Sequence, residues 1–78
     1  MGDSLRYKDW FEKAAEKGHV DAQYNLGVIY ENGEGVSQNY QQAKAWYEKA
    51  ASQNDAQAQF ELGVMNELGQ GESIDLKQ

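Results

Sequence analysis

The chain of 78 residues contains no cysteine, no proline and a single histidine, His19. Without cysteine it has no disulfide, no thiolate zinc site and no thiol nucleophile. One imidazole with no second histidine or cysteine is a poor metal site, so we expect no metal and no cofactor, and we expect His19 to cap a helix. Without proline, no helix meets an internal breaker. These absences argue against a metalloenzyme and against a small disulfide-stabilised domain.

Long apolar runs and basic residues are also scarce. No run of about 18 apolar residues occurs, so the sequence predicts no membrane span. No basic start is followed by an apolar stretch, so we expect no secretory signal and a cytoplasmic location. Seven basic residues face 13 acidic ones, which gives a net charge of −6. This balance argues against nucleic acid and anionic membranes as partners, and it predicts that a partner recognised through charge is basic.

The sequence instead contains an internal repeat of 36 residues. When residues 7–42 are aligned with residues 43–78, 16 of the 36 positions are identical. The identical pairs include Trp10/Trp46, Gln23/Gln59, Leu26/Leu62 and Gly27/Gly63. A repeat of this length is typical of a small unit that cannot bury its apolar face alone and must stack on a neighbour. The repeat therefore predicts a scaffold that holds a partner.

Apolar residues recur at helical spacing in four segments, at about 5–17, 20–32, 40–53 and 56–68. We therefore expect an all-α fold, an α-solenoid of antiparallel helix pairs with about two repeats, which forms a single domain over residues 1–78. Gly18 and Asn54 should end helices in the left-handed conformation. Asp3, Asn39 and Asp75 are 36 residues apart and suit N-caps, which places the start of a further helix at 75–78.

Two glycines and two tryptophans allow predictions about how the helices pack. Gly27 and Gly63 lie in the middle of helices, where glycine costs about 1 kcal/mol relative to alanine. Glycine at both positions predicts a second helix that passes too close for a side chain. Trp10 and Trp46 are predicted to be core residues.

The last predicted helix has no packing partner, so Leu62, Met65 and Leu68 should be uncovered by the repeats themselves. We expect this patch to be covered either by residues 72–78, through Ile74 and Leu76, or by a second chain in a homodimer.

Two segments carry a family pattern. Residues 21–36 read Asp-Ala-Gln-Tyr-Asn-Leu-Gly-Val-Ile-Tyr-Glu-Asn-Gly-Glu-Gly-Val, and residues 45–51 read Ala-Trp-Tyr-Glu-Lys-Ala-Ala. They resemble the Sel-one-like repeat (SLR) family, a relative of the tetratricopeptide repeats, and the resemblance covers nearly the whole chain. It implies a tetratricopeptide-like right-handed superhelix that serves as a protein–protein interaction adaptor. In the second copy, Asn66 and Glu72 replace the tyrosine and the loop valine of the family pattern.

The resemblance also nominates a binding surface, because the first helix of each tetratricopeptide pair lines the concave groove. The segments 20–32 and 56–68 take that place here. Their faces away from the core carry the expected partner-binding residues, at helical spacing: Asp21, Tyr24, Asn25, Val28, Glu31, Asn32, Gln57, Phe60, Glu61, Val64 and Glu67. Residues 18–43 and 50–76 contain no lysine or arginine, so this surface should be acidic and attract a basic peptide or protein. A purely solubilising role for the acidic residues stays open.

Three functions follow from these features. The first is a scaffold that binds a peptide or protein on the acidic concave face. The second is a small acidic neutraliser of a basic toxin or enzyme, as an immunity protein is. The third is a hydrolase of the β-lactamase-like kind, which has been attached to some members of the family and which only the resemblance supports. We expect no enzyme and no catalytic residue, because no serine, histidine and carboxylate form a nucleophilic arrangement. No carboxylate lies in sequence apolar enough to predict a raised pKa.

Overall fold

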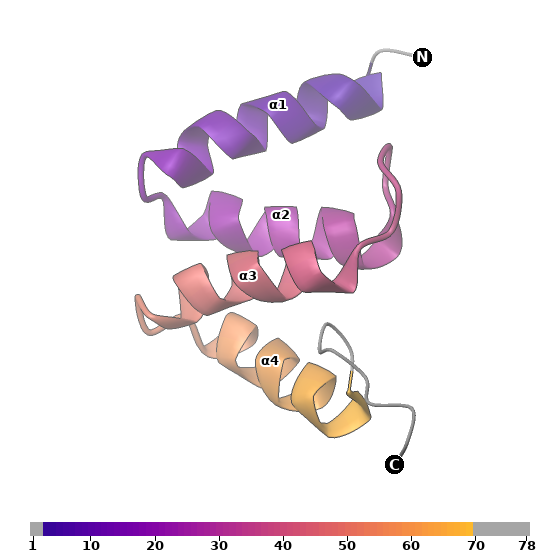
Figure 1. Cartoon of the computed structure of the whole chain (residues 1–78). Helices are drawn as coiled ribbons and strands as arrows, with labels where there is room; N and C mark the ends of the chain where they lie inside the picture. The colour runs from indigo at the N-terminus through magenta and orange to yellow at the C-terminus, as the bar shows by residue number, and fades with distance from the viewer. Residues whose placement is uncertain (1–2, 70–78) are drawn as a thin grey trace.

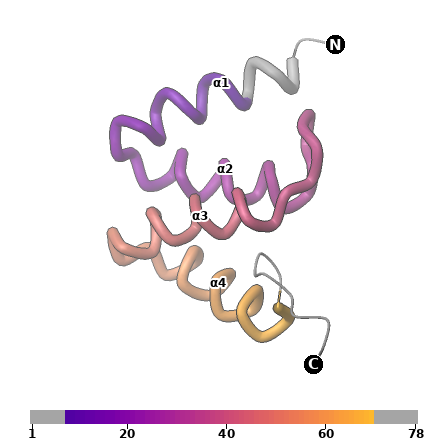
Figure 2. The backbone as a smooth tube through the Cα atoms, in the orientation of Figure 1, coloured from indigo at the N-terminus to yellow at the C-terminus, as the bar shows by residue number. Residues whose placement is uncertain are grey.

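The chain folds as four helices that stack in sequence order. The computed structural model describes residues 3–69, with side chains from Lys8 onward. The helices are α1 (Asp3–Glu16), α2 (Val20–Asn32), α3 (Tyr40–Ala51) and α4 (Ala56–Leu68). Each helix packs against the next one along the chain. Successive helices run in opposite directions, as Figure 1 and the backbone trace in Figure 2 show. This is the all-α arrangement of antiparallel helix pairs that the repeat predicts.

Local backbone chemistry sets the turns between the helices. Gly18 and Asn54, which are equivalent in the repeat, both have positive φ, of 97° and 70°, as predicted. The Asn39 side chain accepts a hydrogen bond from the Gln42 backbone N–H at 3.0 Å and so caps α3. Capping by the His19 side chain was expected and is wrong: His19 precedes α2 but makes no capping hydrogen bond. The equivalent Asp55 does cap α4, accepting from the Ala58 backbone N–H at 2.9 Å, because a carboxylate is the better acceptor.

Two helices differ in extent from the sequence expectation. Helix α1 begins at Asp3 and ends at Glu16, so it covers 3–16 where 5–17 was expected. Helix α3 ends at Ala51 where 53 was expected. The chain turns there because the backbone N–H groups of Gln53 and Asn54 bond to carbonyls three residues back, and Asn54 is left-handed. The further helix expected at 75–78 lies outside the described residues.

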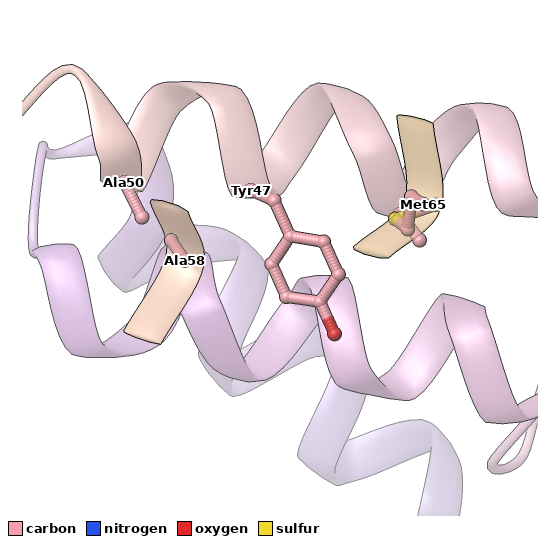
Figure 3. Close-up of a cluster of buried hydrophobic side chains, with 5 residues drawn as sticks. Tyr47, Ala50, Ala58 and Met65 are labelled. Carbon is pink, nitrogen blue, oxygen red and sulfur yellow. The ribbon is translucent and has the colours of Figure 1, made fainter. Parts of the chain in front are cut away.

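The core consists of two clusters of buried side chains, one in each half of the stack. The first cluster lies on α1 and α2 and contains Ala15, Ala22, Leu26 and Ile29. The second cluster lies on α3 and α4 and contains Ala43, Tyr47, Ala50, Ala58 and Met65. Figure 3 shows part of the second cluster. Met65 is fully buried there, so the expectation that it is uncovered is wrong: α3 covers this side of α4. Leu62 is half-buried and Leu68 is exposed, and the covering role expected of residues 72–78 lies outside the described residues.

The two tryptophans lie in different environments. Trp46 packs against the first cluster as a partly buried residue. Trp10 is 79% exposed, so its assignment to the core is wrong. The reason is its place in the stack: among the described helices α1 packs mainly against α2, whereas α3, which carries Trp46, packs against both α2 and α4.

The two mid-helix glycines, Gly27 and Gly63, also lie in different environments. A Cβ atom on Gly27 would lie 2.8 Å from Cζ of Tyr47 and closer still to two other ring atoms. The predicted close approach is therefore confirmed at Gly27. No described atom lies within 4 Å of the corresponding position on Gly63, so the prediction is wrong there. No described helix occupies on α4 the place that α3 occupies on α2.

Candidate functional site

A hollow lies between α2 and α4, on the face that the sequence nominates for binding. It measures about 400 Å³ and is lined by Tyr24 of α2 and by Ala56, Gln57, Phe60 and Glu61 of α4. Phe60 is 69% exposed, although it is a large apolar side chain. An exposed aromatic ring beside a hollow is a feature of binding surfaces more than of closed cores.

Tyr47 of α3 lies in the core behind this face and packs against it. Its side chain is fully buried, and its ring centroid lies 5.5 Å from that of Tyr24, with the planes tilted by 45°. The ring reaches from α3 towards α2 (Figure 3), and its hydroxyl donates a hydrogen bond of 2.7 Å to Oε1 of Glu31. The core thus holds both Tyr24 and the Glu31 carboxylate in place. Burial, and then the bond to Glu31, raise the pKa of the Tyr47 hydroxyl well above its usual range, so it donates at all physiological pH values.

Several carboxylates lie close enough to the hollow to repel one another. Burial, and then the negative charge of Glu31, raise the pKa of the Glu61 carboxyl above its ordinary value. Burial raises the pKa of Tyr24, and the charges of Glu61, Asp55 and Glu31 raise it further. The expectation that no carboxylate has a raised pKa is therefore wrong for Glu61, because tertiary packing supplies the burial that its sequence neighbours do not. Neither α2 nor α4 contains a lysine or arginine that could offset these charges.

The structure brings part of the predicted set together. Tyr24, Gln57, Phe60 and Glu61 line the hollow, and Glu31 acts on it electrostatically. Val28 packs against the second cluster as a partly buried residue, so much of its surface is covered by core residues.

The remaining predicted residues do not line the hollow. Asp21, Asn32 and Glu67 are exposed, and Val64 is half-buried. Asn25 donates to the Asp21 backbone carbonyl at 2.8 Å, and Asn32 donates to the Glu34 carboxylate at 3.3 Å, so both amides have local partners.

Sequence reasoning missed three contributors to this face: Tyr47, Ala56 and Asp55. Ala56 lies four residues before Phe60, so an extension of the helical stripe by one turn finds it. Asp55 caps the start of α4, and its effect on Tyr24 depends on the packing of α4 beside α2. No local pattern connects Tyr47 to Glu31, which is 16 residues away on another helix.

Two smaller hollows lie elsewhere. One of about 350 Å³ lies between α1 and α3, where Nζ of Lys49 is 5.8 Å from the Trp46 ring centroid. The other, of about 300 Å³, lies on α1 beside the exposed Trp10. Within residues 3–69 no three histidine or carboxylate side chains gather as metal ligands would, and no helix is both long and apolar enough to cross a bilayer.

Comparison with known proteins identifies the repeat. A family model described as the Sel1 repeat matches residues 8–19, 20–55 and 56–78. The chain belongs to the Sel1 repeat family. Repeats of this family generally mediate protein–protein interactions, and their fold is typically a non-enzymatic scaffold. A search of curated proteins gives no match.

Two solved structures contain the same arrangement of helices. A Sel1 repeat protein from Oxalobacter formigenes is 44% identical to this chain, with a TM-score of 0.82 over 87% of it. The protein c5321, a protective antigen present in uropathogenic Escherichia coli strains that displays an SLR fold, is 54% identical, with a TM-score of 0.81 over 86% of this chain. The chain spans 28% and 14% of the length of these two proteins.

Proposed function

We propose that this Sel1 repeat chain is a protein-binding module whose α2–α4 face binds a basic peptide segment of a partner protein. The observation that carries the proposal is the hollow between Tyr24, Phe60 and Glu61, where an exposed aromatic ring lies beside carboxylates that repel each other. A lysine or arginine side chain of the partner would relieve that repulsion. The aliphatic part and the charged group of that side chain would also pack on the aromatic rings of Tyr24 and Phe60.

The proposal assigns a separate role to each residue. Phe60 and Tyr24 provide apolar and cation–π contact, and Glu61 provides the charge at the hollow. Glu31 positions the face through its bond with Tyr47 and adds to the negative field. Because basic residues are absent from α2 and α4, a basic partner meets no repulsion there. The proposal assigns no catalytic residue.

The test measures binding of a short fluorescein-labelled arginine–glycine peptide by fluorescence anisotropy. We expect the native chain to bind it and Glu61→Lys to weaken binding by about tenfold or more. Phe60→Ala should weaken binding without changing net charge. Glu31 is unsuitable for charge reversal, because its carboxylate also accepts the Tyr47 hydrogen bond.

The matched control is Glu48→Lys, which changes net charge by the same amount at an exposed position on α3. If Glu48→Lys weakens binding as much as Glu61→Lys does, only bulk charge attracts the peptide and the proposed site is wrong. If Phe60→Ala binds like the native chain, the aromatic part of the proposal is wrong. Tight one-to-one binding of a single basic protein would instead favour the neutraliser function.

A further inference from the structure

The hollow between α2 and α4 has an aromatic ring on each side. Tyr24 lines it from α2 and Phe60 lines it from α4, and these two residues are equivalent in the repeat. Successive repeats present the same position on the same face, so the repeat itself places a ring on both sides of the hollow. A flat group that enters the hollow can therefore stack on aromatic surface from α2 and from α4.

The two rings differ in how firmly the protein holds them. The Tyr24 ring packs against the fully buried Tyr47 ring, with the centroids 5.5 Å apart. Phe60 is 69% exposed, so most of its ring surface is available to a ligand. One wall of the hollow is thus fixed by the core before a ligand arrives, which lowers the entropy that binding costs. The other wall adds apolar contact area.

A carboxylate lies beside these rings. Among the described residues that line the hollow, Glu61 supplies it, and Gln57, one helical turn earlier, supplies a planar amide. Glu61 is half-buried. The charges that raise the pKa of Tyr24 all belong to carboxylates, namely those of Glu61, Asp55 and Glu31. The hollow therefore combines flat apolar surface with a partly desolvated negative charge, and the ligand that suits it best is both planar and cationic.

An arginine side chain meets these two requirements better than a lysine side chain does. The guanidinium group is planar, so its face stacks on an aromatic ring while its edge donates two parallel hydrogen bonds to a carboxylate. It is also more weakly hydrated than an ammonium group, so it loses less on entering a partly buried site. The lysine ammonium is a compact, strongly hydrated point charge. It satisfies the carboxylate but gains less from two flat walls.

We propose that the hollow between α2 and α4 is a pocket for an arginine side chain and that it selects arginine over lysine. The guanidinium plane lies between the Tyr24 and Phe60 rings, and its edge donates to the Glu61 carboxylate. The amide oxygen of Gln57 accepts a further N–H of the five that the group carries. This inference rests on the proposed function and narrows its partner, because the basic segment then needs an arginine at the position that enters the hollow.

Two fluorescein-labelled peptides of equal length and charge test the selectivity by fluorescence anisotropy. One alternates arginine with glycine and the other alternates lysine with glycine, so that both have the same net attraction to the acidic chain. We expect the arginine peptide to bind the native chain about tenfold more tightly than the lysine peptide. Phe60→Ala should bring that ratio close to one, because it removes one of the two rings on which the guanidinium stacks.

The matched control for Phe60→Ala is Trp10→Ala, which removes an aromatic ring that is 79% exposed and lies outside the hollow. It should leave the ratio of the two affinities unchanged. A third peptide carries asymmetrically dimethylated arginine, which keeps its charge but cannot donate both hydrogen bonds. It should bind no more tightly than the lysine peptide. If it binds as tightly as the arginine peptide, the pairing with Glu61 is wrong.

The outcomes separate this inference from the proposed function. Equal binding of the arginine and lysine peptides, with both weakened more by Glu61→Lys than by Glu48→Lys, overturns the inference and leaves the proposed function standing. The inference is also overturned if the preference for arginine persists in Phe60→Ala or falls equally in Trp10→Ala. If Glu61→Lys weakens neither peptide more than Glu48→Lys does, the proposed function itself is wrong. Unchanged helix content by circular dichroism shows that a loss of binding is not a loss of fold.

Discussion

Helices α2 and α4 carry the same repeat but not the same environment. Leu26 is fully buried and the equivalent Leu62 is half-buried. Gly27 lies under the Tyr47 ring, whereas Gly63 faces open space within the described part of the chain. Among the described helices, α2 packs between α1 and α3, while α4 makes its main contact with α3. The difference teaches that, in a repeat protein, the energetic weight of a residue depends on its neighbours as much as on its identity.

The largest expected effect comes from the leucine pair. Leu26→Ala should lower the free energy of unfolding by about 2–5 kcal/mol, because it leaves a cavity inside the first cluster. Leu62→Ala should lower it by only about 1 kcal/mol, because Leu62 is already half in water. Urea unfolding of both variants at low protein concentration measures the difference. Equal losses would mean that Leu62 is covered in solution.

The glycine pair should give effects of opposite sign. Gly27→Ala should destabilise the chain by about 1–3 kcal/mol, because the new Cβ overlaps the Tyr47 ring. Gly63→Ala should stabilise it by about 1 kcal/mol, because alanine is the better helix former and the space is free. Thermal unfolding should separate the two midpoints on either side of the native one, by about 4–8 °C per kcal/mol. Destabilisation by both substitutions would contradict the open environment of Gly63.

The smallest expected effect comes from Glu61 and depends on pH. Its folded pKa lies above the ordinary value of 4.5, so the folded chain binds more protons than the unfolded chain between these two values, and stability falls as the pH rises through that window. Glu61→Gln removes this loss and should stabilise the chain at pH 7 by about 0.5 kcal/mol. The gain should shrink as the pH falls through 4.5 and be lost well below it, where Glu61 is protonated in both states.

Thermal unfolding across this pH range, with Glu48→Gln as a variant of equal net charge, checks the Glu61 prediction. A gain for Glu61→Gln that persists at low pH would show that the effect is not electrostatic.

Much of the fold could be predicted because its signals are local. Helical spacing, the left-handed Gly18 and Asn54, and the Asn39 cap each depend on a few adjacent residues. The candidate site was only partly predictable. The helical stripe found Tyr24, Phe60 and Glu61, but not the Tyr47 hydroxyl that holds Glu31, because that bond joins two helices. The core prediction for Trp10 was wrong. The equivalent Trp46 packs against the first cluster, whereas no described helix covers Trp10 in the same way.

The sequence by itself determined the repeat, the helices and the acidic character of α2 and α4, since periodicity, capping and composition act over short stretches of chain. Only the tertiary structure decided which copy of each residue is buried, where a hollow opens between α2 and α4, and why the pKa of Glu61 rises. Burial and charge repulsion depend on which helices lie next to each other, and equivalent residues of two repeats with different neighbours acquire different properties.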